Sequence, residues 1–193
     1  VRNIAEDIAN CELRPTFVSL VDRSGSGEDV IHKLKNHKVN TEYIEKTRNG
    51  MGTWLAIFDN DGDVAASISK RPDTRPLIPL LEEHGDEIFS QADSVVLQAD
   101  IDRDVVKKCF ELAEKYGKKV YSIVSNMSIV TTRREFLRRF HCFICNQQEA
   151  GLLFLEDYTD KSPEEMRDIL SEKIAQAQIS SMVVTMGAKG SVY

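Results

Sequence analysis

An asparagine and a glutamate one helical turn apart form the first candidate site. The apolar run Phe143-Ile144-Cys145 stops at Asn146, and Glu149 follows three residues later, before an apolar stretch resumes. An asparagine that opens a helix, with an acidic residue at the third helical position, is typical of an N-cap. The same amide and helix N-terminus also suit a phosphate oxygen, and the carboxylate would then require a cation, which indicates Mg²⁺. These residues alone leave both interpretations open.

A second polar segment follows the last predicted strand, SMVVTMG. This strand ends on Thr185, and two glycines follow it, Gly187 and Gly190. Glycines allow backbone N–H groups to approach a ligand closely, although a plain turn would also use them. Ligands of open α/β sheets bind beyond the carboxyl ends of the strands. We therefore expect Asn146 and Thr185 to lie at one edge of the same sheet.

The segment VDRSGSGEDV, between a predicted strand and a predicted helix, carries two further glycines. Gly25 and Gly27 form a G-x-G arrangement, but a dinucleotide fingerprint requires a third glycine where this chain has Val30. The chain also has no G-x-x-x-x-G-K-[ST] phosphate loop. The segment therefore favours a flexible turn over a dinucleotide site.

Two other clusters favour structural roles. Cys142 and Cys145, beside His141, lie in a predicted buried strand, whereas a redox C-x-x-C normally opens a helix. A zinc site usually needs four ligands, and no second Cys/His pair has suitable spacing. The second cluster surrounds one predicted helix, as is typical of a solvated face, and comprises Arg133, Arg134, Arg138 and Arg139.

Alternating strand and helix patterns must position these residues. Strands are predicted in the segments PTFVSLVD, DSVVLQ, KKVYSIVS, CFIC and SMVVTMG, and helices in VRNIAEDIANCEL, GEDVIHKLKNHKV, RDVVKKCFELAEKYG, TTRREFLRRF, QQEAGLLFL and SPEEMRDILSEKIAQAQ. This alternation predicts βαβ units and a mostly parallel sheet. The segment TWLAIFDNDGDVAASIS differs, because two β-prone runs flank a turn at 60–63, which predicts a hairpin that serves as a lid or small accessory sheet.

Composition sets further limits. The chain has 193 residues, 41% of them apolar, which suits one soluble globular domain. A net charge of −6 argues against wholesale binding of nucleic acid. No apolar run reaches the roughly 18 residues of a membrane span. Four cysteines are too few for a disulfide scaffold, so a cytoplasmic location is expected.

Taken together, these motifs resemble the PfkB, or ribokinase-like, family of carbohydrate kinases. The resemblance rests on N-x-x-E at 146–149 followed by V-T-x-G-x-x-G at 184–190, with RNIAEDIA, PTFVSLVD and GTWLAIFDNDGDVAA in the family's order before them. It implies a three-layer α/β/α fold with a mostly parallel sheet. It also implies one partial domain over residues 1–193, in which residues 50–71 form a β lid.

The resemblance further implies transfer of the γ-phosphoryl group of ATP, with Mg²⁺, to a hydroxyl of a sugar or nucleoside. Pseudouridine kinase-like, fructokinase-like and ribokinase-like substrates all fit. It also implies a homodimer paired through the lid. The implied substrate residues are Asn3, Gly52 and Thr53, the implied nucleotide residues are Asn146, Thr185, Gly187 and Gly190, and Glu149 would organise Mg²⁺ through water.

The chain departs from the family pattern at both ends and at one internal site. The family's glycine pair would precede Val1, and its Asp-Thr-x-Gly-Ala-Gly-Asp segment, with the aspartate base, would follow Tyr193. VDRSGSG also replaces the usual Gly-Asp. We therefore expect the middle of a longer kinase, inactive alone, with no catalytic base in this chain. Two alternatives are a kinase-fold protein that binds without turnover, and a flavodoxin-like domain, which would require a phosphate loop after its first strand.

Overall fold

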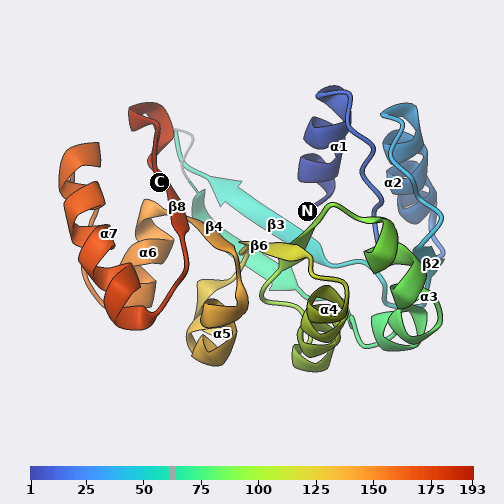
Figure 1. Ribbon diagram of the computed structural model, residues 1–193. Helices are drawn as coiled ribbons and strands as arrows, with labels where there is room; N and C mark the ends of the chain where they lie inside the picture. Colours follow the sequence, from blue (N-terminus) through green and yellow to red (C-terminus); the bar gives the residue numbers. More distant parts are fainter. Residues whose placement is uncertain (61–63) are drawn as a thin grey trace. The chain divides into compact units, whose positions relative to one another are not determined.

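The computed structural model describes residues 1–60 and 64–193 (Figure 1). The chain divides into two compact units, Val1–Glu82 and Glu83–Tyr193. The predicted hairpin turn at 60–63 lies, except for Asn60, outside the described residues. Within the described ranges, no helix is long and apolar enough to cross a membrane.

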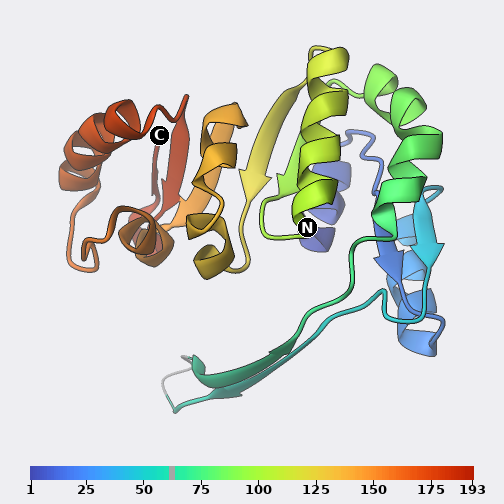
Figure 2. The ribbon, with the colours of Figure 1, turned by 90° about the horizontal axis from the view of Figure 1, so that it is seen from below.

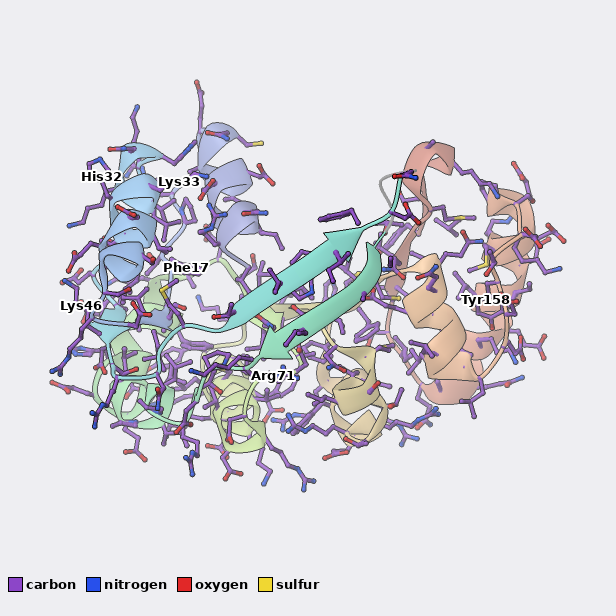
Figure 3. The ribbon with its side chains drawn as sticks, turned by 180° about the vertical axis from the view of Figure 1, so that it is seen from behind. Phe17, His32, Lys33, Lys46, Arg71 and Tyr158 are labelled. Carbon is purple, nitrogen blue, oxygen red and sulfur yellow. The ribbon has the colours of Figure 1, made fainter. Side chains whose placement is uncertain are left out.

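The first unit begins with two helices and a small parallel sheet. Its elements are α1 (Arg2–Asn10), β1 (Ser19–Val21), α2 (Gly25–Asn36) and β2 (Ile44–Lys46), and β1 pairs with β2 in parallel. Ala5 of α1 and Leu34 of α2 form a buried cluster with Val39, and Phe17 packs against it. Figure 3 shows Phe17 beside the two helices. Both helices match the sequence prediction, whereas β2, only three residues long, was not predicted.

An antiparallel hairpin completes this unit, as predicted. Strand β3 (Thr53–Phe58) pairs with β4 (Val64–Lys70). Figure 2 shows them as a two-stranded ribbon on two extended segments, one before β3 and one after β4, which we call stalks. The first stalk passes the carboxyl end of β1, where the Thr47 N–H donates to the Val21 carbonyl at 2.8 Å. A Cβ on Gly50 would lie 2.3 Å from that oxygen, so only glycine allows this approach. We call residues 50–71 the lid.

The second unit holds a five-stranded sheet of order β5-β6-β7-β8-β9, in which the first four strands are parallel and β9 is antiparallel to β8. The predicted mostly parallel sheet is therefore confirmed. Helix α3 (Leu77–Gln91), which was not predicted, begins in the first unit and ends in the second. The other elements are β5 (Ser94–Gln98), α4 (Arg103–Lys115), β6 (Lys119–Ile123), α5 (Met127–Thr131), η1 (Arg134–Arg139), β7 (Cys142–Asn146), α6 (Gln147–Phe154), α7 (Pro163–Ala177), β8 (Met182–Thr185), η2 (Gly187–Lys189) and β9 (Ser191–Val192).

One face of this sheet carries the core of the second unit. Successive crossovers move in one direction from β5 to β8, and right-handed connections then place their helices on the same face. Phe143 of β7 meets Phe140 with ring centroids 6.1 Å apart, and Phe140 meets Phe110 of α4 at 5.0 Å. On the opposite face of β7, Cys142 is buried, Ile144 is half-buried and Asn146 is exposed. The strands are therefore covered most completely on the helical face.

The segment predicted as one helix over 131–140 instead begins at the last residue of the short helix α5 and continues into the 3-10 helix η1. Two consecutive threonines explain the break, because their hydroxyls donate to carbonyls three residues earlier, from Thr131 to Ser128 at 3.0 Å and from Thr132 to Ile129 at 2.7 Å. Two arginines of this segment bind within the unit. Arg134 donates to the Leu153 carbonyl at 2.7 Å and Arg139 pairs with Glu114 at 2.7 Å.

Two adjacent leucines of α6 give a matched test of this packing. Leu153 is 1% exposed, whereas Leu152 is 57% exposed. We expect Leu153→Ala to lower the free energy of unfolding by about 2–5 kcal/mol, because it leaves a cavity in the core. Leu152→Ala should change the free energy of unfolding by less than about 0.5 kcal/mol. Urea denaturation measures both values, and equal losses would contradict the placement of α6.

Candidate functional site

The first turn of α6 holds Asn146 and Glu149. Asn146 ends β7 and caps α6, where its side-chain oxygen accepts a hydrogen bond from the Glu149 N–H at 2.8 Å. A carboxylate oxygen of Glu149, Oε2, accepts in return from the Asn146 N–H at 2.8 Å. These reciprocal bonds form a capping box, so the N-cap interpretation is confirmed. The bonds leave the amide nitrogen of Asn146 and the second carboxylate oxygen of Glu149 available to a ligand.

The adjacent strand brings Thr185 to the same edge. Asn146 and Thr185 are direct partners in the parallel pairing of β7 and β8. Neighbouring strands lie about 4.8 Å apart, so the two residues are immediate neighbours at the carboxyl ends of these strands. Both are exposed, whereas Cys145 and Val184, just before them, are buried. The expected meeting of the two strand ends is therefore confirmed, and the roles of the residues stay predictions.

The glycines after Thr185 form a tight turn into β9. Gly187 has φ 58° and Gly190 has φ 91°, in a region that favours glycine. The Met186 N–H donates to the Gly190 carbonyl at 2.8 Å, which closes the turn. Lys189, which the sequence argument passed over, adds a cation here, and its ammonium donates to the Lys161 carbonyl at 3.3 Å. A lysine between two glycines beside a predicted phosphate site was the signal for it.

The predicted substrate residues all lie in the Val1–Glu82 unit. Asn3 is exposed in the first turn of α1, and Thr53 opens β3. Gly52 lies at the base of the lid, where a Cβ would come within 2.9 Å of the Lys70 carbonyl oxygen and of Pro72. Close approach of the two stalks therefore explains this glycine without a ligand.

The turn at the start of α2 binds its own carboxylate. Asp22 accepts hydrogen bonds from the hydroxyl and the N–H of Ser24, and with Gly27 these bonds hold the pKa of the Asp22 carboxyl below its ordinary value. A Cβ on Gly27 would lie 2.2 Å from the Asp22 carbonyl oxygen, so packing accounts for this glycine. An aspartate thus occupies the place that an anion would take at this helix N-terminus, which supports the predicted turn over a dinucleotide site.

The four cysteines are free thiols, and only Cys11 is exposed. Cys142 and Cys145 are three residues apart on a strand, so their side chains leave opposite faces of the sheet. Burial raises the pKa of the Cys109 thiol to about 12 and also raises the pKa of Cys145. These shifts disfavour the reactive thiolate of Cys109 and Cys145, and Cys142 is buried as well.

The described carboxylates form no ready-made metal cluster. Among residues 1–60 and 64–193, no three His, Cys, Asp or Glu side chains gather in a way that could hold a metal ion. Magnesium is commonly held by one or two carboxylates together with substrate phosphates and several waters. The role of Glu149 in such a site stays a prediction.

Comparison with known proteins finds nucleoside and sugar kinases. A guanosine-inosine kinase from Exiguobacterium acetylicum is 30% identical over all 193 residues, which cover 63% of the relative. The structure of Arabidopsis thaliana ribokinase with ribose and ATP matches with a TM-score of 0.76 and 20% identity, over 98% of this chain and 61% of that one. The structure of adenosine kinase from Sinorhizobium meliloti matches with a TM-score of 0.76 and 18% identity, over 98% of this chain and 58% of that one.

The solved structures establish the fold class, which is the predicted three-layer α/β/α ribokinase-like class. The chain spans 63% of the length of the curated relative it matches. The model of the pfkB family of carbohydrate kinases matches residues 2–193. The chain therefore belongs to the pfkB family of carbohydrate kinases.

Proposed function

We propose that the whole protein transfers the γ-phosphoryl group of ATP to a hydroxyl of a purine nucleoside, with inosine and guanosine as the first candidates. The pairing of Asn146 with Thr185 beside the α6 N-terminus carries the nucleotide part of this proposal. The 30% identity to a guanosine-inosine kinase supports a nucleoside over a simple sugar. Pseudouridine, ribose and fructose are the competing substrates.

Each candidate residue at the carboxyl ends of β7 and β8 has a proposed role. The amide nitrogen of Asn146 donates to a phosphate oxygen, and the N–H groups of the first α6 turn favour the same negative charge. The second carboxylate oxygen of Glu149 would hold hydrated Mg²⁺, which would supply charge neutralisation at the phosphates. Thr185 and the turn from Gly187 to Gly190 line the nucleotide.

The other reactant binds at the first unit in this proposal. Asn3 contacts hydroxyls of the substrate, and the lid around Gly52 and Thr53 covers it. Phosphoryl transfer requires little covalent chemistry from the protein, since positioning and charge stabilisation account for most of the catalysis. The base that accepts the hydroxyl proton is not assigned to any residue of this chain.

A substrate panel tests the proposed reaction on the complete protein that its gene encodes. Inosine, guanosine, adenosine, pseudouridine, ribose and fructose are incubated with MgATP, and both ADP and the phosphorylated product are measured. We expect inosine or guanosine to give the highest kcat/KM. Turnover of ribose or fructose alone would contradict the nucleoside assignment, and binding of ATP without turnover of any of them would favour the binding protein over the kinase.

Two substitutions at Asn146 separate its cap from its proposed phosphate contact. Asn146→Ser keeps a good N-cap but removes the amide donor, so stability should change by less than about 0.5 kcal/mol. Loss of a hydrogen bond to a charged group, about 1.5–3 kcal/mol, should lower kcat/KM for ATP by about 10- to 150-fold. Asn146→Ala should add a stability loss of about 1 kcal/mol. Full activity in Asn146→Ser would show that Asn146 only caps α6 and does not contact the phosphate.

We also propose that the protein forms a homodimer through one face of the lid. Residues directly opposite each other in an antiparallel pair share a face, so Leu55 lies beside Ile68, and Ile57 lies on that face too. These side chains are 60%, 72% and 62% exposed. A two-stranded ribbon is marginally stable alone, and a second copy of the ribbon would cover this aliphatic face.

Two lysine substitutions, one on each face of the lid, test the proposed dimer. Ile68→Lys places a charge in the proposed interface, and we expect sedimentation velocity to show a monomer, because the charge would have to be desolvated. Ser67→Lys introduces the same charge one residue away on the other face and should leave the dimer intact. A wild-type monomer, or a dimer unaffected by Ile68→Lys, would rule out this interface.

A further inference from the structure

The two faces of the lid differ in chemistry. Opposite the aliphatic face, β3 carries Trp54, Ala56 and Phe58, since alternate residues of a strand share a side. The pairing passes from Ile57↔Ala66 to Phe58↔Val64, so the unpaired residue lies on β4 and the alternation of β3 continues unbroken. One face is therefore aliphatic, and the other carries two aromatic rings.

The aromatic face leaves the ring of Trp54 accessible. Its cross-strand partner is Ser69, and the next residues on its side are Ala56 and Ser67. None of these small side chains is large enough to cover an indole. Trp54 is 59% exposed, although a tryptophan can bury about 150–250 Å² and contributes strongly to binding when it does so. Such a ring, framed by small residues, suits a flat partner.

Trp54 lies at the base of the lid. It is the second residue of β3, just after the stalk that passes the carboxyl end of β1, where Thr47 and Gly50 approach the Val21 carbonyl. Ligands of α/β sheets bind beyond such strand ends. Phe58 is four residues further out, about 14 Å at the rise of a strand. Trp54 is thus the aromatic residue nearest the base of the lid.

We propose that the indole of Trp54 stacks on the nucleobase of the substrate, so that the lid distinguishes a nucleoside from a sugar that lacks a base. This inference rests on the proposed nucleoside kinase function. An aromatic side chain stacks on any base, because every base has a π face. Ser67 and Ser69 add hydroxyls beside the ring that suit the polar edge of a purine.

Trp54 is the single tryptophan of the 193 residues, which gives a direct readout on the complete protein if its remaining sequence has none. Titration with inosine should quench the Trp54 fluorescence, whereas ribose should leave it unchanged. In steady-state assays, Trp54→Leu should raise the KM for inosine by about 5- to 100-fold, the range expected for loss of one base–aromatic stack. Trp54→Phe should restore most of the affinity.

Phe58→Leu is the matched control, because it removes an aromatic ring from the same face of the same strand; the KM for inosine should change by less than about twofold. If inosine is phosphorylated but Trp54→Leu keeps its KM and no quenching occurs, the stacking inference fails and the kinase proposal stands. If only sugars without a base are phosphorylated, the nucleoside assignment fails and the stacking inference fails with it.

Discussion

The parallel pairing of β7 with β8 is the constraint on which the candidate site depends. It places Asn146 directly beside Thr185, although 38 residues separate them in the sequence. Burial of Phe143, Cys145 and Val184 on the helical face fixes this register, because a shift by one residue would turn those side chains toward the other face. The apolar core thus determines which polar groups meet at the edge of the sheet.

The capping box fixes the first turn of α6, which is also the phosphate side of the proposed site. The first N–H groups of a helix lack partners within the helix, and Asn146 and Glu149 satisfy two backbone donors at the start of α6. Each side chain uses only one of its polar atoms for this purpose. The cap holds both side chains in place, so little conformational entropy would be lost when a phosphate and hydrated Mg²⁺ bind.

Local signals predicted much of the fold. Ser162 with Glu165 forms the expected cap of α7, and Gly117 has the positive φ expected after α4. Features that depend on tertiary contacts were not predicted. Helix α3 contains Gly85, where a Cβ would lie 2.6 Å from the Leu112 side chain. This close approach joins segments distant in sequence. For the candidate site, the sequence predicted that Asn146 and Thr185 share one edge of the sheet, because strand order implies it. That Asp22 occupies the turn at the start of α2 became known only from the structure.

The central claim is that the α6 cap is also the phosphate and metal side of a nucleotide site. The most direct measurement is the backbone amide NMR spectrum of the complete protein, titrated with a non-hydrolysable ATP analogue and Mg²⁺, then with Mn²⁺ in its place. We predict that the amides of residues 146–149 and 187–190 shift with the Mg²⁺ complex, and that Mn²⁺ broadens the resonances near Glu149. Binding of the analogue that leaves these amides unshifted, while other regions respond, would contradict the claim.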